Sequence, residues 1–181
     1  MGITLSKQDR YDPLKETQAQ DELSADLRGP DSLRQYRTLV VLETDVPSTA
    51  STSFQDVVGL KFDVSPGFNY RFYVMLLYTT SAATIGIRAA INAPTATHLA
   101  YTTRVGISAT GSTDASWENW QTAVDLGTTS ADSLTTTTGN LIILEGVVRP
   151  SAGGTVQVRF APETATASGV VIEAGSTLEW W

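Results

Sequence analysis

The stretch YRFYVMLLY, residues 70–78, decides the fold class of this 181-residue chain. Aromatic and β-branched residues favour extended backbone, and the side chains of a strand alternate between the two faces of its sheet. One face of this strand would hold Tyr70, Phe72, Val74, Leu76 and Tyr78, and the other would hold Tyr73, Met75 and Leu77. Because both faces are apolar, the sequence predicts a strand that is covered on both sides. The stretch LIILEGVV, residues 141–148, has the same two-sided character.

The residues on either side of this strand continue the β pattern. From residue 39 onward the chain is rich in Val, Ile, Thr, Tyr and Phe, and Gly, Pro, Ser or Asn interrupts it at short intervals. We predict strands near residues 38–46, 54–64, 68–79, 84–92, 98–110, 119–126, 139–149, 154–161 and 169–181. This number of strands fits one all-β domain, an antiparallel β-sandwich over residues 38–181. We favour jelly-roll-like connectivity over an immunoglobulin-like order.

Composition and charge narrow the classes of function. The chain has no cysteine, which excludes disulfides, thiolate nucleophiles and cysteine-ligated zinc. Its formal net charge of −7 disfavours nucleic acid as a direct partner. No segment has the length and apolarity of a signal peptide or a membrane span. We therefore expect a soluble protein that is made in the cytosol and has no membrane partner.

The first 37 residues differ in character from the rest and form a predicted N-terminal arm. Asp12 followed by Pro13 is a typical helix start, and Gly29-Pro30 is a stop, so we expect a short helix over residues 13–28. Its apolar positions form a thin stripe of Leu14, Ala19, Leu23 and Leu27. Such a stripe is too narrow for a helix of this length to fold alone, so the arm needs a surface to lie on.

A search for catalytic chemistry finds little. His98 is the one histidine, and no G-x-S-x-G motif surrounds any serine. Carboxylates of the β region show no calcium-loop spacing, among them Asp56, Asp63, Asp114, Glu118 and Asp125. Glycine-rich nucleotide motifs are absent as well. We therefore predict no enzyme, no cofactor and no metal, and interpret His98 as a surface or partner-contacting residue.

One aromatic segment has two interpretations. In ASWENWQTAV, Trp117 and Trp120 stand beside Glu118, Asn119 and Gln121, a mixture of stacking faces and hydrogen-bonding groups that carbohydrate sites use. The other interpretation is that alternation buries one indole in the core and leaves the other on the surface. The second is the commoner arrangement, so a glycan contact at Trp117 and Trp120 stays the secondary hypothesis.

Several motifs occur together in residues 39–181: D-V-x-G-L-x-F at 56–62, Y-R-F, Y-T-T-S-A-A-T, I-x-E-G-x-x-x-P-S-A-x-G-T and the closing aromatic strand. In these motifs the chain resembles a β-domain that recurs in structural proteins of tailed bacteriophages. The resemblance implies a virion protein assembled in the host cytoplasm, either a capsid decoration or head-fibre protein, or a component of the tail or its fibres. It brings no catalytic residues.

The same resemblance implies the partners. We expect a homo-oligomer, with a trimer suggested by phage decorations and fibres, and contacts with capsid or tail proteins. The expected contact residues are Leu14, Leu23 and Leu27 in the arm and Tyr73, Met75, Leu77 and Trp181 in the sandwich. Two other hypotheses stay open. One is an adhesin for host surface glycan, and the weaker one is a depolymerase, which would require paired carboxylates.

The segment GSTLEWW, residues 175–181, places two tryptophans side by side in the sequence. An unpacked pair would expose a large apolar area to water. Alternation puts Trp180 with Leu178 on one face, and Trp181 with Glu179 on the other. We expect Trp180 to anchor the sandwich and Trp181 to be available for a subunit interface.

Overall fold

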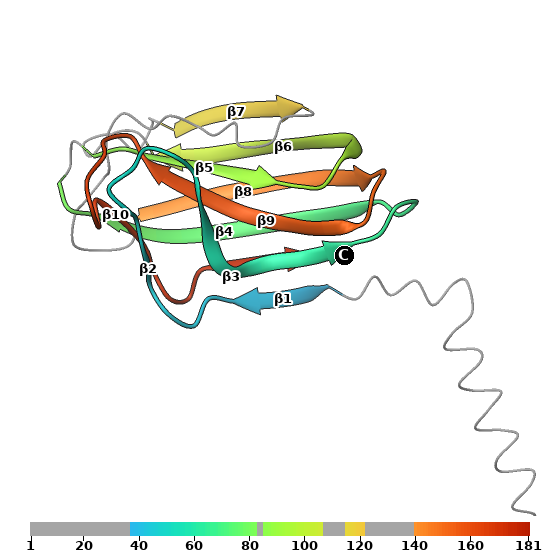
Figure 1. Ribbon diagram of the computed structural model, residues 1–181, viewed down its shortest axis with the longest axis horizontal. Coiled ribbons are helices and arrows are strands. Elements are labelled where there is room, and N and C mark those ends of the chain that lie inside the picture. Colours follow the sequence, from blue (N-terminus) through green and yellow to red (C-terminus); the bar gives the residue numbers. More distant parts are fainter. Residues whose placement is uncertain (1–36, 83–84, 107–114, 122–139) are drawn as a thin grey trace, which may run out of the picture. The chain divides into compact units, whose positions relative to one another are not determined.

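The computed structural model describes residues 37–82, 85–106, 115–121 and 140–181, and for residues 106 and 115–121 it describes the backbone alone. These residues form two antiparallel sheets (Figure 1), which confirms the predicted all-β sandwich. The larger sheet contains, in this order, β1 (Thr38–Val41), β11 (Thr177–Trp180), β4 (Tyr70–Thr80), β8 (Asn140–Pro150), β6 (Ala96–Gly106) and β7 (Ala115–Gln121). Two short strands extend it: β10 (Val170–Ile172) pairs with β4, and β2 (Val46–Pro47) pairs with β10. The smaller sheet contains β3 (Gln55–Val64), β9 (Gly154–Pro162) and β5 (Ile87–Asn92).

The strand pairings are nested. β1 pairs with β11, β2 with β10, β3 with β9 and β4 with β8, all antiparallel. Early strands therefore lie beside late ones, as in a long hairpin ribbon that is rolled into two layers. This arrangement agrees with the jelly-roll-like connectivity that we favoured. The arm residues Leu14, Leu23 and Leu27, and the helix predicted around them, lie outside the described residues.

Two of the predicted strands are each interrupted, so those predictions were wrong in detail. Residues 38–46 make β1 and β2, and residues 169–181 make β10 and β11. The two breaks face each other. Ala174 N–H donates to the Asp45 carboxylate at 2.8 Å, and Gly175, at φ 91°, donates its N–H to the Leu42 carbonyl at 2.8 Å. The turn at Gly175, which requires positive φ, thus separates β10 from β11 at the point opposite the break between β1 and β2.

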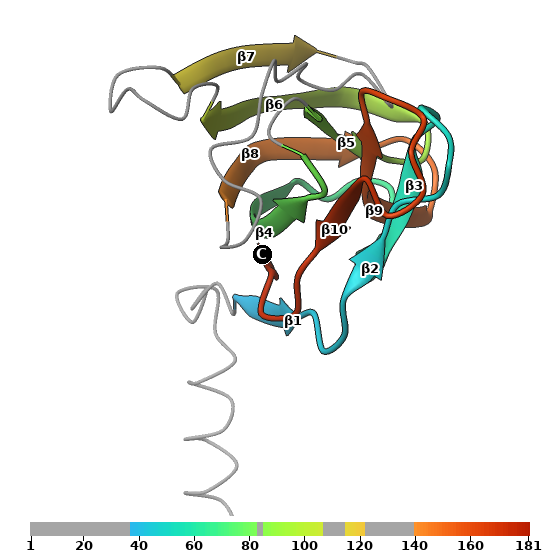
Figure 2. The ribbon, with the colours of Figure 1, turned by 90° about the vertical axis from the view of Figure 1, so that its left-hand side faces the viewer.

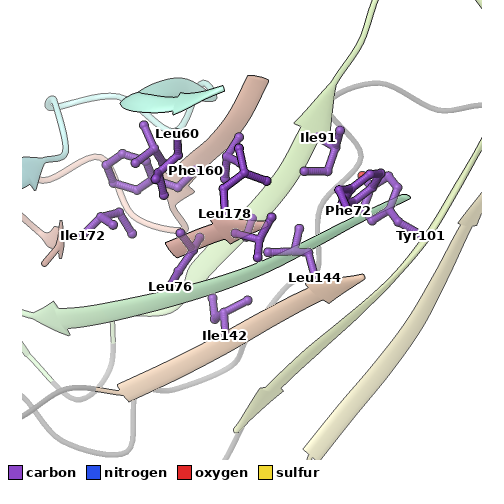
Figure 3. Close-up of a cluster of buried hydrophobic side chains, with 14 of the residues drawn as sticks. Leu60, Phe72, Leu76, Ile91, Tyr101, Ile142, Leu144, Phe160, Ile172 and Leu178 are labelled. Atoms are coloured by element: carbon purple, nitrogen blue, oxygen red, sulfur yellow. The ribbon is translucent and has the colours of Figure 1, made fainter. Parts of the chain in front are cut away.

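The core lies between the two sheets (Figure 3). Alternate residues of β4 point into it, and Phe72, Val74 and Leu76 are at most 1% exposed. Side chains of β8 and of the smaller sheet meet them, including Ile142, Leu144, Leu60 and Phe160. The predicted alternation of YRFYVMLLY therefore holds, with its first face in the core.

Gly146 of β8 has no side chain, and two aromatic rings from the neighbouring strands approach each other above it. It lies between Phe72 of β4 and Tyr101 of β6 in register, and the two ring centroids are 6.4 Å apart. A Cβ at position 146 would lie 2.4 Å from the Ala100 carbonyl oxygen and 2.5 Å from the Tyr101 Cβ. The backbone of the neighbouring strand occupies that space, so only glycine fits without displacement.

We expect Gly146→Ala to lower the free energy of unfolding by about 1–3 kcal/mol, since the added methyl overpacks a closed part of the core. Urea denaturation measures the loss. Gly153→Ala is the matched control, because its nearest neighbour would be 3.7 Å away, and it should change stability little. Equal effects of the two substitutions would contradict the packing argument.

Tyr78 is a second core position with a measurable consequence. Its side chain is fully buried, its hydroxyl has no hydrogen-bond partner among the described residues, and burial raises its pKa to about 12. The folded state therefore favours the neutral phenol, whereas the unfolded chain ionises at its ordinary value of 10.0. The contribution of neutral Tyr78 to the free energy of unfolding is therefore fully present below pH 10.0. It is lost as the pH rises from about 10 to about 12.

Over that interval Tyr78 should reduce the free energy of unfolding by about 1.4 kcal/mol per pH unit. We expect Tyr78→Phe, which keeps the ring, to remove this part of the alkaline loss. Tyr73→Phe, at a half-buried position on the other face of β4, should retain it. Denaturation at pH 8 and pH 11 tests the difference, and identical alkaline losses in both variants would argue against it.

Candidate interaction surface on the larger sheet

The face of the larger sheet that points away from the core, here called the outer face, is apolar and exposed. Its exposed large side chains are Leu39 (57%), Val41 (48%), Met75 (36%), Leu141 (38%) and Val147 (40%). Half-buried Tyr73, Leu77, Ile143 and Trp181 lie among them. Strand register places Val41, Thr177, Met75 and Ile143 in one row across β1, β11, β4 and β8. Apolar side chains gathered on one exposed face of a sheet in this way are typical of a contact surface.

The charged groups on the outer face are largely paired with one another. Arg104 Nη2 lies 2.6 Å from Glu145 Oε1, and Arg37 Nη1 lies 3.4 Å from Glu179 Oε2. Both pairs are solvent-accessible, so each adds little to stability. Each pair also offsets one positive and one negative charge on the outer face.

Arg71 on β4 is not paired in this way. It is exposed, and its side chain makes no hydrogen bond or ion pair with the other described residues. It lines a hollow of about 290 Å³ together with Tyr73, Glu145, Val147 and Trp181. The hollow thus combines aromatic surface, a carboxylate and an available guanidinium.

The two tryptophans take opposite faces of the sheet, as the alternation predicted. Trp180 packs on the core side, where its ring stacks on Phe62 with centroids 5.1 Å apart and an interplanar angle of 10°. Trp181 exchanges backbone hydrogen bonds with Arg71, at 2.9 and 3.1 Å. Its ring lies on the outer face, 4.5 Å from the Arg37 guanidinium carbon. That geometry is a cation–π contact at an exposed site.

The structure brings together the sandwich residues that the sequence singled out. Tyr73, Met75 and Leu77 occupy successive outward positions of β4, and Trp181 lies beside them next to Arg71. The sequence analysis missed Leu39, Val41, Leu141 and Val147. Their alternation was readable in LVV and LIILEGVV, but it did not show which face of each strand the second sheet would cover.

The candidate polar residues do not converge. His98 is exposed on β6, opposite Arg149 in register. Asp56 lies 3.0 Å from Arg159 Nε, and Asp63 accepts a hydrogen bond from the Thr155 hydroxyl at 2.7 Å. Within the part of the chain that the structure describes, no three His, Asp or Glu side chains could hold a metal ion. Asp114 and Asp125 lie outside the described residues, and Glu118 is in β7.

Trp117 and Trp120 are on β7, opposite Arg104 and Tyr101 of β6. Their side chains lie outside the described part of the structure, so the glycan hypothesis at these two residues stays a prediction. None of the described segments is a helix long and apolar enough to cross a membrane.

Comparison with known proteins adds two structural likenesses. No protein-family model matches the chain, and no curated protein matches its sequence. Among solved structures, the VP2 subviral particle of infectious bursal disease virus has 14% identity and a TM-score of 0.43, covering 80% of this chain and 32% of that chain. The infectious bursal disease virus Gx strain has 14% identity and a TM-score of 0.24, covering 80% of this chain and 38% of that one. This chain thus spans less than two fifths of the length of either, and we draw no functional conclusion from them.

The opposite placement of the two indoles predicts unequal effects on stability. We expect Trp180→Ala to lower the free energy of unfolding by about 3 kcal/mol, because it removes the ring that covers Phe62. Trp181→Ala should cost about 1 kcal/mol or less, since it removes an exposed cation–π contact. Chemical denaturation at low protein concentration measures both, and a larger loss from Trp181→Ala would reverse the assignment.

Proposed function

We propose that this chain is a non-enzymatic structural protein of a bacteriophage virion, a capsid decoration or head-fibre protein that residues 1–37 attach to the particle. Its partners would be further copies of itself and other virion proteins, such as capsid components. The observation that carries the proposal is the exposed apolar outer face of the larger sheet. The likeness of residues 39–181 to β-domains of tailed-phage structural proteins supports the same proposal at the level of motifs.

The outer face supports assembly for a physical reason. Leu39, Val41 and Val147 each expose 40% or more of their surface, and their strands lie in one sheet. Covering such side chains with another copy removes apolar area from water, which is the main favourable term in association. The paired charges around them would add specificity more than affinity. A repeating structural protein needs a surface of this kind, whereas an enzyme does not.

The arm supplies the proposed attachment. In a helix over residues 13–28, at about 100° per residue, Ala19, Leu23 and Leu27 share one side. Leu14 falls on the opposite side, so the stripe predicted from the sequence narrows to these three residues. One short apolar stripe cannot stabilise an isolated helix of this length. Docking on another virion protein would provide the missing apolar contact, and this coupling of folding to binding suits a reversible anchor.

A tail or tail-fibre protein that binds host surface glycan is the alternative. The hollow at Arg71, Tyr73 and Trp181 favours it, because aromatic surface beside hydrogen-bonding groups is what sugar sites use. Tryptophan fluorescence titrated with host polysaccharide would separate the two proposals. A saturable change that Tyr73→Ala abolishes would favour the adhesin, and no change would favour the purely structural role.

We expect deletion of residues 1–37 to leave a folded body that no longer attaches to the particle. Particles assembled with full-length or truncated chain are banded by density, and an antibody against the β body measures attachment in the particle band. Circular dichroism of the purified chains measures folding. Full-length protein in the particle band and truncated protein in the soluble fraction are the expected results. A truncated chain that still bands with particles would move the anchor to the sandwich, and a full-length chain absent from the band would refute the proposed function.

A further inference from the structure

β1 lies at one edge of the larger sheet (Figure 1 and Figure 2). Among the described strands it pairs with β11 and with no other, so its second edge has no strand beside it. An edge of this kind presents backbone donors and acceptors that another strand can use.

The hydrogen-bond pattern fixes which residues of β1 face that open edge. Leu42 donates its N–H to the Ser176 carbonyl at 2.8 Å, and the register pairs Val40 with Leu178 and Thr38 with Trp180. Because the direction of backbone groups alternates along an antiparallel strand, Thr38, Val40 and Leu42 point theirs at β11. Leu39 and Val41 therefore point their N–H and C=O groups away from the sheet.

The open edge lacks the features that normally prevent pairing. Proteins protect sheet edges with lysine, proline or a bulge, whereas β1 reads TLVV. Its outward residues Leu39 and Val41 also have the largest exposed fractions among the large apolar side chains of the outer face. The strand is thus suited to pairing, and the side chains beside the edge gain from being covered.

We propose that β1 of one copy pairs antiparallel with β1 of a second copy, about a two-fold axis at Val40. In this register the Leu39 of one copy lies opposite the second copy's Val41, so apolar side chains meet on the outer face. Arg37 then lies opposite the second copy's Glu43, and the same contact occurs twice because the interface is isologous. Glu43 is exposed and makes no ion pair with the described residues of its own chain.

Neighbouring registers are less favourable. A shift by two residues in one direction places Leu39 opposite Glu43, and a shift in the other direction places Arg37 opposite Val41. The register centred on Val41 also brings Arg37 opposite Asp45, but it leaves Leu39 opposite Glu43. Only the register centred on Val40 places no charge opposite an apolar side chain, since the sequence RTLVVLE is complementary to itself in that alignment. The occupant of the edge is therefore a second copy of this chain.

The pairing would join two larger sheets into one and bring their outer faces side by side. It rests on the proposed role in assembly, and it specifies contacts that come in pairs. An assembly built with it has an even number of copies, in place of the trimer that the phage resemblance suggested.

Charge reversal in the full-length chain tests the contact by sedimentation over a range of concentrations. Arg37→Glu alone and Glu43→Arg alone should each weaken self-association at least tenfold, because each makes like charges meet twice. An equimolar mixture of the two variants should return close to the wild-type affinity, since the acidic side chain introduced at position 37 then faces the basic one introduced at position 43. Recovery only on mixing is the expected result.

Glu179→Gln is the control, because it removes the partner of Arg37 within the chain and leaves the proposed contact untouched. It should leave self-association unchanged. Single reversals without effect, a mixture as weak as its components, or a wild-type chain without even-numbered species would each overturn the pairing. Particle attachment is measured separately, so a chain that bands with particles but shows none of these charge effects refutes the β1 contact and not the proposed function.

Discussion

Burial of the inner face of β4 against the smaller sheet is the interaction on which the rest of the structure depends. Phe72, Val74 and Leu76 on this strand are almost completely excluded from solvent, and β8, β10 and β11 all pair with it. Once that face is covered, strand geometry sends Tyr73, Met75 and Leu77 to the other side of the sheet. The apolar outer face is thus a direct consequence of a strand that is apolar on both faces in a two-layer fold.

Much of this could be predicted from the sequence because the strand signal is local. The alternation in YRFYVMLLY, the two-sided LIILEGVV and the opposite facing of Trp180 and Trp181 all follow from a period of two. The interruptions within residues 38–46 and 169–181 could not be predicted in the same way. They depend on hydrogen bonds between Asp45 and Ala174 and between Leu42 and Gly175, which are more than 100 positions apart in the chain.

The set of residues on the outer face could not be predicted from local sequence either. Leu39 and Val41 come from the start of the β region and Leu141 and Val147 from a strand about 100 residues later, so only the order of strands brings them to one surface. Their chemistry then gives two kinds of contact. The apolar side chains of the face suit broad burial, and the open edge of β1 offers hydrogen bonds with a defined register. A protein that is repeated many times in a particle can use both, the face for affinity and the edge for geometry.

The central claim is that the outer face is a self-interface, and the mass of the full-length chain in solution tests it most directly. Light scattering would compare the native chain with Met75→Glu, which places a charge in the middle of the face at a position that is already 36% exposed. The account predicts a closed oligomer for the native chain and a smaller species for the variant, with the same melting temperature for both at low concentration. A native chain that stays monomeric at every concentration, or a variant with unchanged mass, would contradict it.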